Sequence, residues 1–234
     1  MKKKTALKRR KISKVAKPSK HKDNELVGKL SLRQLARRLH DGPIQAVAAL
    51  AMQADIANRL LNRDPTAAAA ELTKLEELAR RTTRELRHLQ FTLRPQSLES
   101  AGLAVALGDL AAHDNELYGD AVNIEIEQGA DARLNDPQKE YLFHIAADAI
   151  SNARKYGLAT KIEVGLRQLS NETTLEIRDN GIGFDLKKEG NNNDGDLGLG
   201  LDLMKLRTRL MGGRLKIETQ TGLGTVVRVS VPVK

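Results

Sequence analysis

Seven residues recur at alternating three- and four-residue steps between positions 72 and 93, and six of them are apolar. They are Leu72, Leu75, Ala79, Thr82, Leu86, Leu89 and Leu93. Residues at this spacing lie on one face of an α-helix and form the seam of a coiled coil. A helix with such a seam must bury it against another helix, which restricts the possible folds more than any other feature of the sequence.

A first helix is predicted over residues 24–62, because an apolar stripe follows the same steps there. Its members are Leu32, Leu35, Leu39, Ala46, Leu50, Ala57 and Leu61. Residues 62–66 predict a turn, with Asp64 or Thr66 as the cap of the next helix. Two amphipathic helices joined by a turn do not close a core alone, whereas two hairpins from separate chains form a four-helix bundle. We therefore expect a helical hairpin over 24–95 that forms a dimeric four-helix bundle, and hence a homodimer.

A different pattern begins after Pro95, and we place a second domain over residues 96–234. Helices are predicted over 103–118, 137–156 and 198–211, and strands over 122–127, 160–169, 173–179, 213–219 and 224–232. Helices grouped with mostly consecutive strands favour an α+β fold, a two-layer α/β sandwich in which helices cover one face of a mixed sheet.

The charge distribution separates the N-terminal tail from the rest of the chain. Residues 1–22 contain eleven Lys or Arg and no acidic residue, whereas the remainder has 28 basic and 30 acidic residues. We expect residues 1–23 to be a disordered, solvated tail, and contact of this tail with nucleic acid or an anionic membrane stays open. The sequence has no Cys and no run of eighteen uncharged apolar residues. We therefore expect a cytoplasmic protein without a disulfide, membrane span or secretory signal.

The run His40-Asp-Gly-Pro-Ile-Gln45 lies inside the first predicted helix. Pro43 interrupts the helix because proline lacks a backbone N–H, and such a departure beside a histidine is typical of a functional site. Asp41 and Gln45 lie on helix faces that flank His40. A neutral imidazole attacks an electrophile through one nitrogen, while a neighbouring carboxylate can bind the other N–H.

Two glycine-rich motifs follow much later in the chain. Asp179-Asn-Gly-Ile-Gly-Phe-Asp185 comes directly after a predicted strand, and Gly198-Leu-Gly200 opens a predicted helix, whose free N–H groups would attract phosphate. The first motif alone is also an ordinary turn signal. Residues 186–196, between the two motifs, contain almost no apolar residues and predict a mobile lid, with an unstructured surface loop as the alternative.

The segment Leu32-Arg-Gln-Leu-Ala-Arg-Arg-Leu-His-Asp-Gly-Pro-Ile-Gln45 resembles the phosphoacceptor box of the sensor histidine kinases that work with NarL-type response regulators. Phe143-His-Ile-Ala-Ala-Asp-Ala-Ile-Ser-Asn-Ala-Arg-Lys-Tyr156 resembles the N box of the same family. The resemblance implies that the Asn152 side-chain oxygen holds Mg²⁺ and that Lys155 meets phosphate. Asp148 stands where the family most often has Glu to orient or activate the attacking group, and Asp is shorter by one methylene.

The two glycine motifs resemble the G1 and G2 boxes of the family's ATPase domain. The resemblance implies that Asp179 accepts a hydrogen bond from the adenine amino group and that Gly181 and Gly183 let the backbone approach the base. Gly198 and Gly200 would contact phosphate. We also expect Thr225, which follows the predicted hairpin Gly222-Leu-Gly224, to contribute to cofactor binding.

The resemblance implies an ATP-dependent protein kinase that phosphorylates itself on His40 and transfers the phosphoryl group to an aspartate of a response regulator receiver domain. Asp41 would assist the reaction, and Gln45 would position water for a phosphatase reaction on the regulator. Arg38 stands where relatives often have Glu. Alternatives are a regulatory protein of the same fold that binds ATP without kinase activity, an anti-sigma serine kinase, and a nucleic-acid-binding adaptor. A separate sensor protein is a further possible partner.

Overall fold

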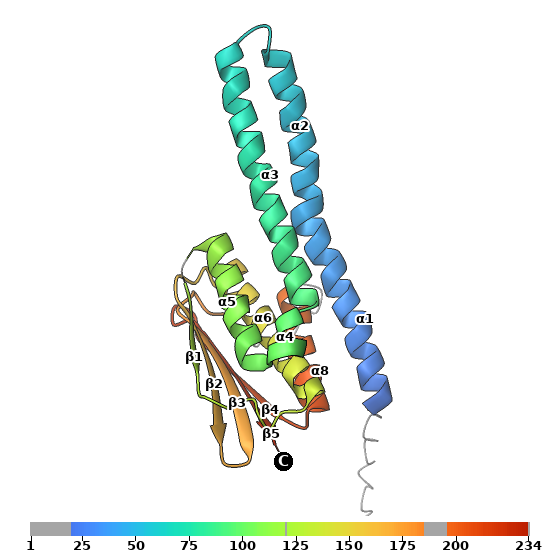
Figure 1. Ribbon diagram of the computed structural model, residues 1–234, viewed down its shortest axis with the longest axis vertical. Helices are drawn as coiled ribbons and strands as arrows, with labels where there is room; N and C mark the ends of the chain where they lie inside the picture. The colour runs from blue at the N-terminus through green and yellow to red at the C-terminus, as the bar shows by residue number, and fades with distance from the viewer. Residues whose placement is uncertain (1–19, 120, 185–195, 234) are drawn as a thin grey trace, which may run out of the picture.

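The first three helices form a long hairpin (Figure 1) in the computed structural model, which describes residues 20–119, 121–184 and 196–233. Helix α1 (Lys20–Leu39) continues through a π-helical turn, η1 (His40–Ile44), directly into α2 (Gln45–Leu60). Helix α3 (Pro65–Leu93) returns along α2, and the Asp64 side chain caps it by accepting a hydrogen bond from Ala67 N at 3.0 Å. Pro43 therefore changes the helix type locally without ending the rod.

The apolar stripes of the hairpin are only partly covered within one chain. Ala57, Ala68 and Thr82 are buried, whereas Leu72 and Leu86 of the predicted seam are 49% and 41% exposed. Other exposed large apolar side chains of the hairpin are Leu26, Leu32, Ile44, Val47, Met52, Ile56, Leu61 and Leu93. The hairpin thus presents an apolar surface that its own two arms do not cover.

The part of the chain after Pro95 contains the remaining described helices and all the described strands. The helices are α4 (Gln96–Ala101), α5 (Leu103–Tyr118), α6 (Asp136–Lys155) and α8 (Asp196–Leu210). The strands are β1 (Val122–Ile126), β2 (Ile162–Leu169), β3 (Glu172–Asp179), β4 (Arg214–Thr219) and β5 (Thr225–Pro232). Helix α4 lies in a segment for which the sequence predicted no helix.

The strands form one five-stranded mixed sheet in the order β1-β2-β3-β5-β4. Strand β1 runs parallel to β2, and the other neighbours are antiparallel. The register between β3 and β5 pairs Asp179 with Thr225 at the end of the ladder. This pairing joins two residues that are far apart in sequence.

Helices α5, α6 and α8 cover one face of this sheet (Figure 1). The layer between them is apolar, and its fully buried side chains include Leu103, Leu107, Leu142, Phe143, Ile145, Ile162, Leu166, Leu175 and Met204. Burial alternates along β2 and β3, as expected for a sheet with one covered face. The partly exposed Glu176 and Arg228 make a cross-strand ion pair at 2.6 Å. The predicted two-layer fold with a mixed sheet is confirmed.

Two predicted segments fall partly or wholly outside the described residues. The basic tail predicted over residues 1–23 is outside them up to residue 19. The lid predicted over residues 186–196 is outside them up to residue 195. None of the described helices is long and apolar enough to cross a membrane.

Candidate active site

A cavity lies between α6, α8 and the sheet, and several of the motif residues line it. The lining residues are Ala149, Asn152, Ala153, Tyr156, Gly157, Ile177, Asp179, Gly183, Phe184, Leu197, Leu201, Met204, Ile217, Thr225 and Val227. Most of these side chains are apolar, with a small number of polar groups among them. This is the usual composition of a site for a flat, partly apolar ligand such as a nucleotide base.

Asp179 is held in this cavity by backbone groups. Its Oδ1 accepts hydrogen bonds from Gly181 N at 2.8 Å and from Thr225 N at 3.2 Å. Burial raises the pKa of the Asp179 carboxyl, and these two N–H groups together with the Thr225 side chain oppose that rise. Because its oxygens have four lone-pair sites in all, the carboxylate keeps capacity to accept from a ligand.

The glycines around Asp179 are required by close packing of backbone. A Cβ on Gly181 would collide with the carbonyl oxygen of Gly157, and one on Gly183 with that of Gln220. Gly183 also has φ +62°, which favours glycine. A Cβ on Gly224 would collide with the carbonyl oxygen of Asp179. The turn after β3 and the hairpin before β5 therefore pack directly on each other, which the sequence analysis did not predict.

Asn152 and Gly200 come together where α6 meets the first turns of α8. A Cβ on Gly200 would lie 3.5 Å from Asn152 Nδ2 and 3.9 Å from Asn152 Oδ1. Gly198, two residues before Gly200 in the first turn of α8, is also buried. Mg²⁺ prefers oxygen ligands and keeps several waters and phosphate oxygens, so one amide oxygen at this place fits a nucleotide-bound magnesium ion. No cluster of three or more His, Cys, Asp or Glu that could hold a metal ion occurs among the described residues.

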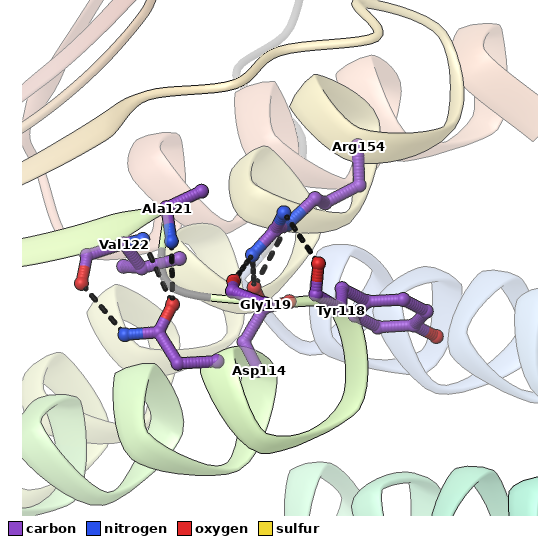
Figure 2. A network of polar contacts seen from close by, with 7 residues as sticks. Asp114, Tyr118, Gly119, Ala121, Val122 and Arg154 are labelled. Atoms are coloured by element: carbon purple, nitrogen blue, oxygen red, sulfur yellow. Dashed lines mark hydrogen bonds and ion pairs between the residues drawn. The ribbon is translucent and has the colours of Figure 1, made fainter.

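Helix α6 is fixed at both ends. At its start, the Asn135 side chain accepts from Gln138 N and the Gln138 side chain accepts from Asn135 N, both at 3.0 Å. At its end, Arg154 donates to Asp114 of α5 at 2.6 and 2.9 Å and to the Gly119 carbonyl at 2.9 Å (Figure 2). Arg154 follows Asn152 by two residues, so this network holds the segment that carries the candidate metal ligand.

Asp148 does not line the cavity, and its carboxylate contacts the hairpin instead. Its Oδ1 accepts hydrogen bonds from Gln34 at 3.1 Å and Arg38 at 2.6 Å, both on α1. Its Oδ2 accepts from Arg207 of α8 at 2.7 Å. Sequence reasoning noted that the residue at 38 differs from that of relatives but missed this contact.

His40 lies on the surface of the π-helical turn. Its side chain is 69% exposed, and its Nδ1 lies 2.9 Å from Asp41 Oδ1. This contact leaves Nε2 as the nitrogen that is available for attack. Gln45, the first residue of α2, is also exposed, and Pro43 is buried.

Lys155 is exposed and lines a second cavity rather than the one that contains Asp179. This second cavity lies between α6 and the hairpin, and it is also lined by Asp41, Gly42 and Pro43 of η1. The structure therefore brings Lys155 to the turn that follows His40, while Asn152 lines the cavity that contains Asp179.

Two family models match two separate segments of the chain. One, described as "Histidine kinase", matches residues 32–98. The other, described as "Histidine kinase-, DNA gyrase B-, and HSP90-like ATPase", matches residues 138–234. The first contains the His40 segment and the second contains Asn152, Asp179 and Gly200.

Curated relatives carry the same two segments. An uncharacterized sensor-like histidine kinase of Chloroflexus aurantiacus is 40% identical over 86% of this chain and 34% of its own length. The histidine-protein kinase/phosphatase DegS of Brevibacillus brevis is 29% identical, over 86% of this chain and 51% of DegS. The oxygen sensor histidine kinase NreB of Staphylococcus carnosus is 30% identical, over 86% of this chain and 56% of NreB. The chain therefore spans a third to about half of the length of these relatives.

Solved structures support the fold. A bacterial phosphotransferase gives a TM-score of 0.55 at 12% identity over 87% of this chain and 95% of that one. A blue-light activated histidine kinase of Erythrobacter litoralis gives 0.50 at 19% identity, over 86% of this chain and 59% of that one. The two family models, which together match most of the chain, and the curated relatives define the class: the chain belongs to the histidine kinases. DegS and NreB are among its relatives, and the resemblance of the residues around His40 to this family is confirmed.

Proposed function

We propose that the chain is an ATP-dependent protein histidine kinase that phosphorylates its own His40 and passes the phosphoryl group to an aspartate of a response regulator. The observation that carries this proposal is the contact of Asp41 with Nδ1 of an exposed His40, on the same chain as an Asp179 cavity suited to adenine. A histidine on the surface of a helix has no structural need for such a partner. A phosphoacceptor does, because its ring must be oriented and its developing charge stabilised.

The reaction needs both halves of the chain. The Nε2 lone pair of His40 forms the bond to the γ-phosphorus of ATP, and the bond from that phosphorus to the bridging oxygen breaks, so that ADP leaves. The Asp41 carboxylate, on Nδ1, stabilises the positive charge that develops on the ring. Asp179 would select adenine, because guanine presents an acceptor where adenine has an amino group. Mg²⁺, held through Asn152 and phosphate oxygens, would neutralise charge on the phosphates.

The remaining candidate residues have supporting roles in this proposal. Lys155 would meet phosphate in the cavity that it shares with Asp41. Gly198 and Gly200 would place the amino end of α8 against phosphate. Gln45, exposed on the side of the hairpin, would position water against the aspartyl phosphate of the regulator, which makes the protein its phosphatase as well. The buried contacts of Asp148 support a structural role more than that of a general base.

We further infer a homodimer, in which the exposed apolar surface of the hairpin packs on a second copy. The side chains that support this inference lie along α1, η1, α2 and α3, from Leu32 to Leu93. Covering them would complete the four-helix bundle that the heptad pattern predicts.

Autophosphorylation is tested by incubation with γ-labelled ATP and Mg²⁺, followed by acid treatment of the labelled protein. Phosphohistidine is acid labile, so the label should form on the wild type and disappear in acid. It should be absent from His40→Gln and present on the matched control His21→Gln, which replaces another exposed histidine of the same rod. Label retained on His40→Gln would move the acceptor elsewhere. Absence of label on a wild type that binds ATP would favour the regulatory protein without kinase activity.

A further inference from the structure

The two faces of α6 line two different cavities. The face toward the candidate nucleotide site carries Ala149, Asn152, Ala153 and Tyr156. The other face lines the second cavity, between α6 and the hairpin, with Ala147, Ile150, Ser151, Arg154 and Lys155. Residues three and four apart share one face of a helix, so the two sets lie about 180° apart around α6. The second cavity is therefore separated from the nucleotide site by the helix itself.

The second cavity has a volume of about 550 Å³. Pockets of roughly 300 to 1,000 Å³ hold small organic ligands. Helices α1, α3, α5 and α6 and the turn η1 all contribute to the lining, so both halves of the chain build this cavity. Its apolar side chains include Leu89, Leu110, Ala147, Ile150 and Leu158. A ligand of this cavity would therefore need an apolar body.

Most charged side chains of the lining are already paired within the protein. The pairs are Arg38–Asp148 at 2.6 Å, Arg81–Glu85 at 2.9 Å, Arg154–Asp114 at 2.6 Å (Figure 2) and Asp41–His40 at 2.9 Å. Lys155 is the remaining charged side chain of the lining, and it makes no hydrogen bond or ion pair with the described residues. The charge left for a ligand to neutralise is therefore positive.

Two further polar side chains of the lining have hydrogen-bonding groups without a partner in the described part of the chain. They are His88, whose Nδ1 is buried, and Ser151. Burial, together with the charges of His113 and Arg38, lowers the pKa of His88 to about 4, so the imidazole is neutral at neutral pH and donates from one ring nitrogen. Ser151 and Lys155 are four residues apart, so they lie next to each other on α6. The cavity thus offers donors that lack an acceptor.

Leu158 is 69% exposed where it lines this cavity, although its side chain is large and apolar. Its φ of +51° lies in the left-handed region, which leucine rarely adopts. Rarely populated backbone conformations cluster at ligand sites. An apolar ligand that lay against Leu158 would remove this side chain from water.

We propose that the second cavity is a binding site for a small carboxylate with an apolar body, separate from the nucleotide site. The carboxylate accepts hydrogen bonds from Lys155 and Ser151 at the exposed edge, and the apolar body packs between α3, α5 and α6. His88 offers a further donor inside the cavity. A carboxylate fits better than a phosphate dianion, because Asp41 and Glu85 also line the cavity and would repel the second charge.

The test is calorimetric titration of the full chain with three probes that share one apolar body. Octanoate carries the carboxylate, 1-octanol is neutral and octylammonium is positively charged. Octanoate should bind more tightly than the other two, because it alone can pair with Lys155. Saturation with adenosine, which lacks phosphate, should leave the affinity for octanoate unchanged, because α6 separates the two cavities.

Two variants and one control locate the ligand. Lys155→Met should weaken octanoate binding about tenfold, as expected for the loss of one charge-assisted hydrogen bond, and should leave 1-octanol binding unchanged. Ser151→Leu fills part of the cavity and should weaken all three probes. Lys139→Met, at a lysine of α6 that does not line this cavity, should bind octanoate like the wild type. In magnetic resonance spectra, octanoate should shift the imidazole signals of His88 but not those of His21, which is exposed at the start of α1.

Failure of octanoate to bind at millimolar concentration, or equal affinity for the three probes, would overturn the proposal. Competition by adenosine would overturn it as well, because octanoate would then occupy the nucleotide cavity. Unchanged octanoate affinity in Lys155→Met would exclude the carboxylate contact. Lys155 also belongs to the kinase function proposed above, but none of these measurements requires label on His40. A protein that fails to autophosphorylate and still binds octanoate at this place would refute the kinase function alone.

Discussion

Replacing Asp179 by Asn should weaken ATP binding through the orientation that the backbone imposes on the new side chain. Oδ1 of Asp179 accepts from the N–H groups of Gly181 and Thr225. The amide oxygen of Asn must take this place, since the amide nitrogen would put N–H groups against two donors. The nitrogen then points at the adenine amino group, so that a donor faces a donor where a carboxylate had accepted.

The expected loss follows from the bond that disappears. A hydrogen bond to a charged group contributes about 1.5 to 3 kcal/mol, so the dissociation constant should rise about tenfold to a hundredfold. Calorimetric titration of Mg·ATP and Mg·GTP into wild type and Asp179→Asn measures both affinity and base selectivity. Asp55→Asn, an exposed carboxylate of the hairpin, is the matched control.

The preference for ATP over GTP should shrink in Asp179→Asn, because guanine offers an oxygen to the new amide nitrogen. An unchanged affinity for ATP in a variant with wild-type circular dichroism and thermal stability would refute the assignment of this carboxylate to adenine. A loss that is equal for ATP and GTP would show that Asp179 acts only by holding the turn.

Three further outcomes are expected. Gln45→Ala should leave autophosphorylation nearly unchanged and slow dephosphorylation of a cognate regulator, because an amide orients water but is a poor proton acceptor. Asp41→Ala should instead slow autophosphorylation. Equal losses of both activities in Gln45→Ala would contradict this division of roles. Light scattering should give a dimer for the wild type and for Leu169→Glu, an exposed site on the sheet, but a monomer for Leu72→Glu; a dimeric Leu72→Glu would place the interface elsewhere. Burial and the nearby Arg207 lower the pKa of His144 to about 4 from 6.5, so its neutral form stabilises the fold above pH 6.5 and that stability is lost as pH falls toward 4. Urea unfolding should therefore show about 2 kcal/mol less loss between pH 6.5 and pH 5 in His144→Gln than in the wild type, and an identical loss would exclude this histidine as the cause.

The helices of the hairpin could be predicted from local pattern because a helix places residues three and four apart on one face. The cap at Asp64 and the interruption at Pro43 follow from the chemistry of single residues, and both occur in the structure. The exception was α4, which lies between Pro95 and Gly102. This helix has six residues and is too short to show a helical repeat of apolar residues.

Asn152, Asp179 and Gly200 were identified from local sequence motifs. The fold brings these three residues to one cavity or to its edge. The contact of Thr225 N with Asp179 depends on the pairing of β3 with β5. This pairing brings together two residues that are 46 positions apart in sequence. The periodicity of apolar residues within a strand does not indicate the order of the strands in a sheet. Thr225 could be proposed for the site, but its role in holding the carboxylate could not.

The sequence by itself determined the existence and type of most elements, because propensity, periodicity and caps act over a few residues, and its motifs supplied the residues that are proposed for the site. The tertiary structure alone decided the partners of Asp148. Arg38 is 110 residues away from it and Arg207 is 59 residues away. A carboxylate in an N box helix can face a nucleotide, water or another helix with the same local sequence. Which of these it meets depends on how α1 and α8 pack on α6, and that packing is set by the summed contacts of the whole interface.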